Sequence, residues 1–269
     1  MEIVTPQESD WQVFQRLAAE EDWLIPDSEL ALFSGPLNGA AFVLKDEEDC
    51  RGFVTAVCHG RSAWIGNLLV PPGYRGRGHG SELFAHALEV LTLQGAEDIW
   101  LTASEQGRPL YEKRGFREIG AIERWQGTAM EEGHDIGDPN GIEALLEVDR
   151  RVWGEARPML KALAGEGRIL VHGGSAALLQ AGNGTRVIGP WITPDLCPRE
   201  NRLLLRDLLS SAPGGTRLVC DVFDRSPVRS LLRAADFTVS GRTALMVRGA
   251  AREVDLAPLV SLASLGSIG

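Results

Sequence analysis

The sequence predicts an α/β (α+β) fold of two tandem, similar halves, each a mixed, mostly antiparallel sheet flanked by helices. Three observations support this prediction. Residues 41–70 alternate apolar stretches with short polar turns, which is the pattern of an antiparallel meander. A glycine-rich loop then leads into an amphipathic helix at residues 81–93, whose apolar residues recur at helical spacing. The same order of elements returns after residue 140, which indicates an internal repeat.

The first helix has a clear start signal. Thr5 can act as the N-cap, Pro6 suits the first helical position, and Glu8 lies where it completes a capping box. We expect this helix to run to about Glu20, and a short second helix to follow near residues 26–33.

The rest of the first half reads as strands and two helices. Gly115 closes the second of these helices, since glycine is the usual residue at a left-handed helix cap. Strands are expected at residues 41–45, 51–59, 63–70 and 99–103, helices at 81–93 and 109–114, and two more strands between Arg117 and Met130.

A polar, turn-rich stretch divides the chain. We therefore expect a first domain at residues 1–130, a linker at 131–140 and a second domain at 141–269. The second domain is expected to contain helices at 142–153, 158–163, 200–211 and 227–235, strands at 168–171, 186–192, 217–222 and 243–248, and a hairpin turn at 181–184.

Two pairs of dipeptides fix the register of the repeat. Ile65-Gly66 corresponds to Ile188-Gly189, and Gly115-Phe116 corresponds to Asp236-Phe237. In each pair, the second dipeptide follows the first after nearly the same number of residues, as a true repeat requires.

Composition excludes several function classes. The formal net charge of −10 and the pI of about 5.1 argue against nucleic acid as a partner, because that needs a basic face. The four cysteines form no C-x-x-C pair and no leader precedes them, so reduced thiols and a cytoplasmic location are expected. No apolar stretch is long enough for a membrane span, and no Cys/His spacing suggests a metal.

The residues that carry chemistry lie between the third strand and the helix that follows it. Arg75-Gly76-Arg77-Gly78-His79-Gly80 joins the two without a gap. The glycines allow successive backbone N–H groups to point into one concavity, and the helix N-terminus adds positive partial charge. The loop is therefore an anion site suited to a diphosphate, with Arg75 and Arg77 at its rim.

Other phosphate-binding loops fit less well. A Walker A loop has glycines spaced like Gly73 and Gly78, but His79 stands where its lysine is required. A dinucleotide fingerprint needs G-x-G-x-x-G, whereas the glycines here run G-x-G-x-G.

The pattern R-x-x-G-x-G at residues 75–80 resembles the signature of the GNAT superfamily of N-acetyltransferases. The run Leu110-Tyr111-Glu112-Lys113-Arg114-Gly115-Phe116 is similar to a second motif of that family, in the expected order. The resemblance covers about residues 1–130 and implies that acetyl-CoA binds there as co-substrate. The whole chain is similar to tandem GNAT proteins of the YitH-like group, which pair one active domain with a degenerate C-terminal GNAT domain.

The resemblance also implies roles for single residues. The N–H of Val70 would stabilise the developing oxyanion, and Tyr111 would protonate the leaving thiolate. The cofactor would be bound by Leu68, Leu69, Val70, Arg75, Gly76, Arg77, Gly78, His79, Gly80, Ser81 and Ser104.

The chain departs from the family pattern at two points. Ser104 stands where the family often has asparagine, so one hydrogen bond to the cofactor is altered. No glutamate lies on the strand at 63–70, so the general base stays open among Asp22, Asp27 and Glu105.

The second half lacks the diphosphate loop. Residues 188–199 have neither the glycines nor their spacing, and Pro194 and Pro198 remove N–H donors. Residues 223–236 contain no tyrosine. We therefore expect a GNAT-like domain that does not bind the cofactor.

Two function classes remain. The leading one is an N-acetyltransferase that moves the acetyl group of acetyl-CoA to a primary amine of a small molecule, with the acceptor unknown. The alternative is a non-catalytic module that binds acyl-CoA or a partner protein. The intact loop and Tyr111 favour the enzyme, and the missing base favours the module. Whether two copies form a homodimer stays open.

Overall fold

A computed structural model describes residues 1–47, 49–130, 137–138 and 140–269. Its helices are α1 (Glu8–Glu20), α2 (Asp27–Ser34), α3 (His79–Leu93), α4 (Arg108–Glu112), α5 (Gly141–Trp153), α6 (Met159–Ala164), α7 (Pro198–Ser210) and α8 (Val228–Ala234), with 3-10 turns η1 (Asn38–Ala40) and η2 (Pro72–Tyr74). Its strands are β1 (Glu2–Val4), β2 (Ala41–Asp46), β3 (Asp49–Cys58), β4 (Ser62–Leu69), β5 (Asp98–Ala103), β6 (Arg117–Thr128), β7 (Arg168–His172), β8 (Ser175–Leu179), β9 (Thr185–Ile192), β10 (Arg217–Phe223), β11 (Thr238–Arg248) and β12 (Leu259–Ser261).

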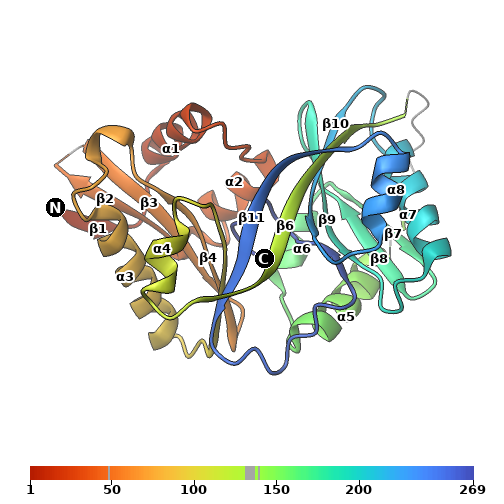
Figure 1. Ribbon diagram of the computed structural model, residues 1–269. Coiled ribbons are helices and arrows are strands. Elements are labelled where there is room, and N and C mark those ends of the chain that lie inside the picture. Colours follow the sequence, from red (N-terminus) through yellow and green to blue (C-terminus); the bar gives the residue numbers. More distant parts are fainter. Residues whose placement is uncertain (48, 131–136, 139) are drawn as a thin grey trace.

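The strands of the described residues form one twelve-stranded sheet, in the order β1-β2-β3-β4-β5-β11-β6-β10-β12-β9-β8-β7 (Figure 1). Most neighbouring strands are antiparallel, and the parallel pairs among them are β4 with β5 and β9 with β10. The predicted fold class, a mixed and mostly antiparallel sheet flanked by helices, is therefore confirmed.

The two halves exchange strands at the centre of the sheet. β11 comes from the second half but lies between β5 and β6 of the first half. Residues 122–128 of β6 in turn pair with β10 of the second half. Figure 1 shows the two long strands running side by side across the molecule. Each half thus completes the sheet of the other.

The prediction of two strands between Arg117 and Met130 is wrong, because this stretch is the single strand β6. The partner that a second local strand would supply is β11 instead. Gly120 and Gly127 do not make a turn. A Cβ at either position would overlap a phenyl ring, that of Phe223 or Phe237, so these glycines let aromatic side chains pack on the strand.

Several element boundaries also differ from the prediction. Helix α1 begins at Glu8 with Gln7 as its N-cap, and the carboxylate of Asp10 accepts the N–H of Gln7 at 2.8 Å. The capping box is therefore built from Gln7 and Asp10, not from Thr5 and Glu8. The short strands β1 and β12 were not predicted, since three residues carry no readable periodicity.

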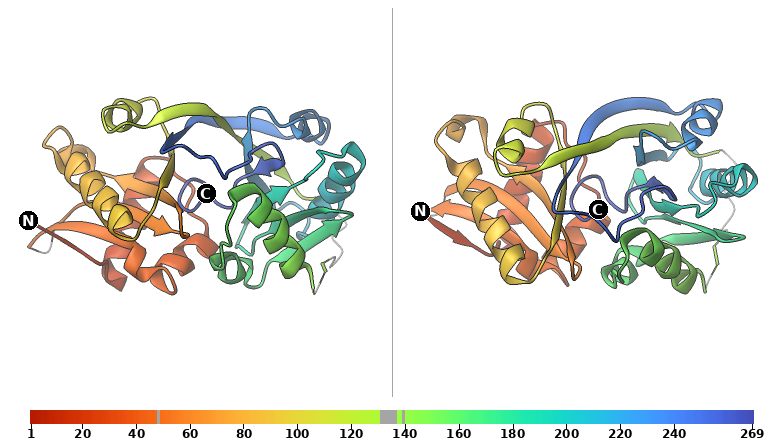
Figure 2. Two further views of the ribbon diagram at one scale, coloured as in Figure 1. Left: turned by 90° about the horizontal axis from the view of Figure 1, so that it is seen from below. Right: turned by 60° about the horizontal axis from the view of Figure 1, so that its bottom comes forward.

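Helices cover both faces of the sheet. Helices α1, α2, α5 and α6 pack on one face, which we call the inner face, around a large apolar core that includes Phe14, Phe33 and Trp64. Helices α3 and α4 pack on the other, outer face in the first half, and α7 and α8 do so in the second half. Figure 2 shows the inner-face helices of both halves on the same side of the sheet.

The corners before Phe116 and Phe237 have matching backbones. Gly115 has φ +85° and Asp236 has φ +61°, and each directly precedes its phenylalanine after a short helix. The N–H of each phenylalanine bonds to a carbonyl five residues earlier, that of Tyr111 or Leu232. This supports the proposed repeat. The domain boundary at 131–140 stays a prediction, because residues 131–136 and 139 lie outside the described residues.

Among the described residues, no helix is both long enough and apolar enough to cross a membrane.

Candidate functional site

The glycine loop opens directly onto the N-terminus of α3. Gly76 and Gly78 have positive φ angles of +75° and +91°, which favour glycine. A Cβ at either position would meet no atom within 4 Å, so the space beside both glycines is open. The first intrahelical bond runs from Glu82 N–H to the carbonyl of Gly78 at 3.0 Å. The preceding N–H groups of the helix have no acceptor within it, and they suit an anion.

The two arginines of the loop have different environments. Arg75 donates through Nε to the carbonyl of Val70 at 2.8 Å and through Nη2 to Glu21 at 2.5 Å. Arg77 is exposed, lies over the ring of Tyr74 at 5.6 Å, and has no ion pair within the part of the chain that the structure describes. Arg75 therefore holds the strand end in place, and Arg77 is the cation available to a diphosphate.

Strand β4 bulges just before the loop. Gly66 lies opposite Thr55 of β3 while Leu69 lies opposite Phe53, so β4 has one extra residue in this interval. Asn67, within the bulge, has φ +51°. Such bulges redirect a strand and leave local backbone groups unpaired.

Strands β4 and β5 separate beyond the bulge. Their parallel pairing covers only residues 62–64 of β4 and 98–100 of β5. On its other edge, β5 pairs with β11 over residues 99–103, so residues 101–103 have no partner on the edge that faces β4. An opening therefore lies between the ends of β4 and β5, bordered by the backbone of residues 68–70.

The loop and the opening together fit acetyl-CoA. The N-terminus of α3 and Arg77 can take the diphosphate, and an extended pantetheine can add along the backbone of residues 68–70 as a strand adds to a sheet edge. The predicted residues Gly76, Gly78, His79, Gly80 and Ser81 lie in this loop or in the first turn of α3. His79 is buried, so its contribution to a ligand comes from its backbone.

Tyr111 lies on the outer face at the end of this opening. Its ring packs against Phe84 at 4.9 Å and Phe116 at 6.3 Å between ring centroids. The hydroxyl has no hydrogen bond with another described residue, and lies beside Gly107, whose N–H donates to the Ser104 hydroxyl at 3.2 Å. Burial raises the pKa of Tyr111 to about 12, so the phenol stays protonated at neutral pH.

None of the three carboxylates predicted as base candidates is buried. Asp22, Asp27 and Glu105 are all exposed.

Glu29 on α2 is a stronger candidate that sequence reasoning missed. Its side chain is 3% exposed and lies on the inner face. Burial raises the pKa of its carboxyl above the ordinary value of 4.5, against the opposing influence of nearby Ser267 and Asn67. Asn67 Nδ2 donates to Oε1 at 3.3 Å, whereas Oε2 has no hydrogen-bond partner among the described residues. One sequence signal existed: Glu29 shares a helical face with the apolar Leu32 and Phe33.

The second half supplies a wall to this site. Residues 264–269 lie against the inner face of β4: the Trp64 indole N–H donates to the carbonyl of Gly266 at 3.0 Å, and a Cβ at Gly66 would lie 2.5 Å from the Cα of Ser267. Arg124 on β6 donates to the carbonyl of Leu265 at 2.9 Å. The groups that act on Glu29 thus come from both halves: Asn67 from the first and Ser267 from the second.

The corresponding opening in the second half is filled by the chain itself. Parallel pairing of β9 and β10 covers residues 185–187 and 217–219. Beyond it, β12 inserts between them, pairing Ser261 with both Trp191 and Val222. A strand therefore occupies the place where a pantetheine would add in the first half.

Comparison with known proteins agrees with this geometry. Residues 38–118 match the family described as "Acetyltransferase (GNAT) domain". Glucosamine 6-phosphate N-acetyltransferase of Trypanosoma brucei brucei is 34% identical over 84 residues, which are 31% of this chain and 53% of that protein. The chain thus spans about half the length of this curated relative.

Two solved structures share the fold over nearly the whole chain. One is a proposed acetyltransferase from Pyrococcus horikoshii, with a TM-score of 0.79 at 20% sequence identity. The matched region covers 98% of this chain and 94% of the Pyrococcus chain. The other is a GCN5-related N-acetyltransferase from Sphaerobacter thermophilus, with a TM-score of 0.66 at 16% sequence identity. The matched region covers 94% of this chain and 98% of the Sphaerobacter chain. The glycine loop and the tyrosine motif lie inside the matched stretch, so residues 38–118 are similar to the GNAT acetyltransferase domain.

Proposed function

We propose that the chain transfers the acetyl group of acetyl-CoA to a primary amine of a small molecule by direct attack. The observation that carries this proposal is the open glycine loop at the N-terminus of α3, next to the separation of β4 and β5. Acetyl-CoA would bind through residues 68–70, 75–81 and Ser104 of the first half alone, because β12 fills the second opening.

Three groups of the chain would act on the reacting atoms. Glu29 would take a proton from the ammonium group of the acceptor, so that the neutral amine can attack, and burial raises the pKa of its carboxyl, which makes the carboxylate a stronger base. The Val70 N–H would donate to the carbonyl oxygen as negative charge develops there. As the C–N bond forms and the C–S bond breaks, the nitrogen would lose its second proton to solvent. Tyr111 would give its phenolic proton to the sulfur, and solvent would restore that proton to the phenol.

The positions of these groups agree with the two-sided approach that the reaction needs. Tyr111 belongs to the outer-face core with α3, whereas Glu29 lies on the inner face with α1 and α2. The cofactor would therefore enter from the loop side, and the amine from the side of Glu29. Residues 264–269 would form the wall against which the acceptor lies.

A thiol-release assay tests the proposal. The protein would be incubated with acetyl-CoA and a panel of primary amines that includes glucosamine 6-phosphate, the compound that the Trypanosoma brucei brucei relative is named for. We expect release of coenzyme A with at least one amine, and none from the Gly78→Val variant, whose side chain would fill the loop and oppose its φ angle.

The binding module is the second candidate, because the carboxylate of Glu29 is buried in this structure. Calorimetry separates the two. Tight binding of acetyl-CoA by the wild type, without thiol release for any amine in a broad panel, would favour the module. Failure to bind acetyl-CoA would contradict both.

A further inference from the structure

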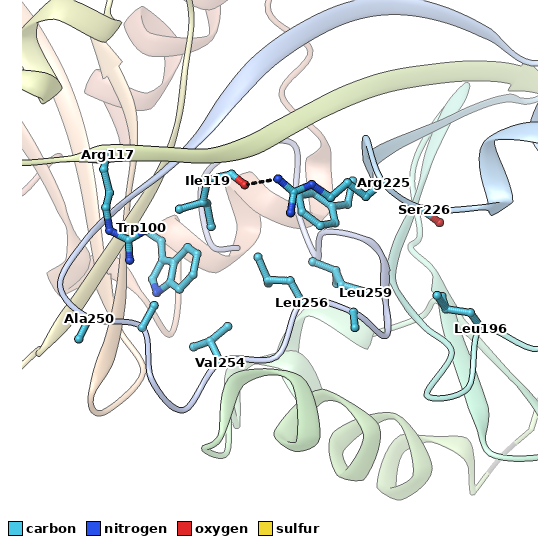
Figure 3. Close-up of a pocket in the computed structure, with 13 residues that line it drawn as sticks. Trp100, Arg117, Ile119, Leu196, Arg225, Ser226, Ala250, Val254, Leu256 and Leu259 are labelled. Atoms are coloured by element: carbon cyan, nitrogen blue, oxygen red, sulfur yellow. Dashed lines mark hydrogen bonds between the residues drawn. The ribbon is translucent and has the colours of Figure 1, made fainter.

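A second cavity lies between the two halves, away from the cofactor loop (Figure 3). It has a volume of about 510 Å³, within the usual range of small-molecule sites. Its walls come from β5 and β6 of the first half, the end of β10, and the segment between β11 and β12 of the second half. Because it is built from both halves, its shape depends on the strand exchange.

This cavity is separate from the proposed active site. Trp100 and Leu259 in its wall belong to the inner-face core, whereas Tyr111 belongs to the outer-face core. Along β5, Trp100 precedes Ser104 by four residues, or about 13 Å at about 3.3 Å per residue. None of the residues predicted to bind acetyl-CoA lines the cavity.

The lining is apolar with a positive rim. Trp100, Phe223, Leu256 and Leu259 supply rings and aliphatic carbons, and the charged residues of the lining are two arginines. No carboxylate is among the lining residues, although the chain has a net charge of −10. Such a local reversal of charge favours an anion at this position.

The two arginines are available to a ligand. Arg117 and Arg225 are both exposed and stand on different walls of the cavity (Figure 3). Arg117 Nη2 donates to the carbonyl of Gly249 at 3.4 Å, and Arg225 Nη2 donates to that of Ile119 at 3.2 Å. Neither forms an ion pair with a residue in the described ranges. Each guanidinium has five N–H donors, so most of them remain for another acceptor.

We propose that this cavity binds a small amphipathic carboxylate, whose charged group lies between Arg117 and Arg225 and whose aromatic or aliphatic body packs on Trp100 and Leu256. The planar guanidinium matches a carboxylate in two-point geometry. The apolar walls provide the contact area that selects the body of the ligand. Because such a ligand touches both halves, its binding stabilises their junction against unfolding.

The test uses three matched probes with the intact chain: 1-naphthylacetate, its neutral analogue 1-naphthylacetamide, and 1-naphthyl phosphate. Binding is followed by calorimetry and by the melting temperature. We expect 1-naphthylacetate to bind and raise the melting temperature. The amide should bind roughly tenfold or more weakly, because it lacks the charge-assisted hydrogen bonds. Tighter binding of the phosphate than of the carboxylate would overturn the carboxylate assignment.

Variants place the probe in the cavity. Arg117→Gln with Arg225→Gln should weaken 1-naphthylacetate binding roughly tenfold or more, since both charged donors are lost. Arg248→Gln is the matched control, because Arg248 is an exposed arginine outside the cavity. Leu256→Trp should block binding by filling the space. Equal binding by the double variant and the control would overturn the proposal.

The affinity for acetyl-CoA distinguishes this proposal from the proposed function. The double arginine variant should bind acetyl-CoA as the wild type does, because Arg117 and Arg225 lie outside the loop at 75–81. Loss of acetyl-CoA binding in that variant would mean that the cavity is not an independent site.

Discussion

At the scale of single residues, the loop arginines are expected to have distinct roles although they lie two positions apart. Arg75 is held by Val70 and Glu21, so it fixes the backbone whose N–H we propose as the donor to the thioester carbonyl. Arg77 has no such restraint among the described residues and stacks on Tyr74, itself also covered by Arg51 at 4.1 Å. The sequence pattern placed both arginines at the rim of the loop and did not distinguish their roles.

Arg77→Ala should weaken acetyl-CoA binding more at low salt than at high salt, because its effect on the diphosphate is Coulombic and exposed. We expect a loss of roughly threefold to tenfold at low ionic strength. Calorimetry at two salt concentrations measures it. Arg75→Ala is the comparison: it should lower turnover more than affinity, since Val70 loses its anchor. A salt-independent loss in Arg77→Ala would contradict the assignment.

Tyr111→Phe should lower the rate of the chemical step roughly 10²–10⁴-fold, the usual range for a general acid. The Michaelis constant for acetyl-CoA should change little, because the donated hydrogen bond strengthens only as charge develops on sulfur. With a pKa of about 12, Tyr111 should add no alkaline limb to the rate profile below about pH 10. Unchanged turnover in single-turnover kinetics would leave Tyr111 as a packing residue.

Glu29→Gln should remove the acidic limb of the pH–rate profile, because the wild-type carboxylate must be ionised to accept a proton. The same variant should be more stable than the wild type at neutral pH. Burial raises the folded-state pKa above 4.5, so the folded form holds the proton more tightly than the unfolded form. The stabilising effect of the protonated carboxyl is therefore present below pH 4.5 and is lost as pH rises through the folded pKa.

Urea unfolding at several pH values checks the stability part. The gap between Glu29→Gln and the wild type should widen with rising pH and close in acid. Glu105→Gln is a suitable control, because Glu105 is exposed and should alter neither the profile nor the stability. A variant that kept the acidic limb would remove Glu29 from the mechanism.

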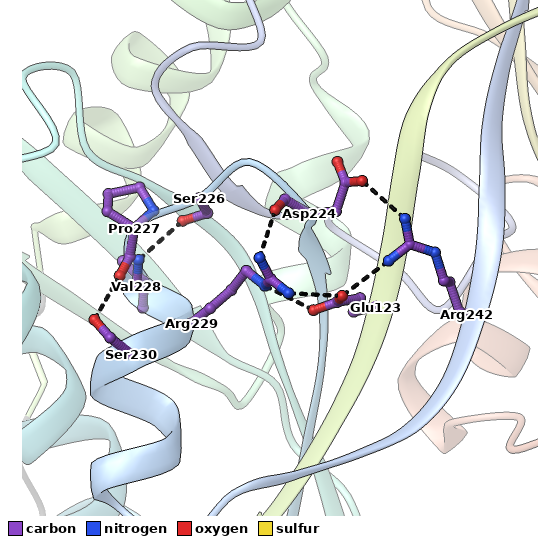
Figure 4. A network of polar contacts seen from close by, with 8 residues as sticks. All are labelled: Glu123, Asp224, Ser226, Pro227, Val228, Arg229, Ser230 and Arg242. Carbon is purple, nitrogen blue, oxygen red and sulfur yellow. Dashed lines mark hydrogen bonds and ion pairs between the residues drawn. The ribbon is translucent and has the colours of Figure 1, made fainter.

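At the scale of elements, a buried glutamate connects β6, β11 and α8 (Figure 4). Glu123 on β6 accepts from Arg229 of α8 at 2.8 and 2.9 Å and from Arg242 of β11 at 2.9 Å. Asp224 accepts from the same two arginines, through its backbone carbonyl from Arg229 and its carboxylate from Arg242. These bonds fix the strand exchange where one chain segment crosses into the other half.

Glu123→Gln should destabilise the protein by about 1–3 kcal/mol, because the neutral amide removes the carboxylate that pairs with Arg229 and leaves Arg242 with Asp224 alone, at a side chain that is 5% exposed. The urea midpoint should fall with an unchanged slope. Glu112→Gln removes an exposed helical pair with Arg108 and should change stability by no more than about 0.5 kcal/mol. Equal effects of the two substitutions would deny Glu123 a structural role.

At the scale of the whole molecule, the exchange of β6 and β11 makes each half depend on the other. Without β11, strand β5 and one side of β6 would have unpaired backbone groups and an exposed apolar surface. Without residues 264–269, Trp64 and Arg124 would lose their carbonyl acceptors. The predicted unit at 1–130 is therefore not expected to be a self-sufficient folding unit.

Residues 1–130 expressed alone should aggregate or remain unfolded, because open strand edges invite intermolecular pairing. Co-expression with residues 137–269 should restore a soluble complex that binds acetyl-CoA. Circular dichroism and size-exclusion chromatography would follow the outcome. A soluble, cooperatively folding fragment with full acetyl-CoA affinity would show that the exchanged strand is dispensable.

Features that depend on local chemistry could be predicted from the amino-acid sequence. Glycines at 76, 78 and 80 between an apolar strand and an amphipathic helix predicted the loop, and its positive φ angles are those that the glycines permit. The periodicity of residues 81–93 and the cap at Gly115 predicted their elements nearly to the residue. The same short motifs gave the family resemblance, placed at about residues 1–130, and the family match falls within it at residues 38–118.

Strand pairing and the burial of polar groups depend on contacts between distant segments, which local sequence patterns do not record. The alternation of apolar residues predicts which side chains of a strand are buried, but not which strand it pairs with. The pairing of β11 with β6 could therefore not be predicted from residues 117–128. The environment of Glu29 depends on Asn67 and on residues 264–269, which are remote in the chain. Burial of a carboxylate and the closing of a cavity result from contacts between distant segments, and these form only when the two halves fold together.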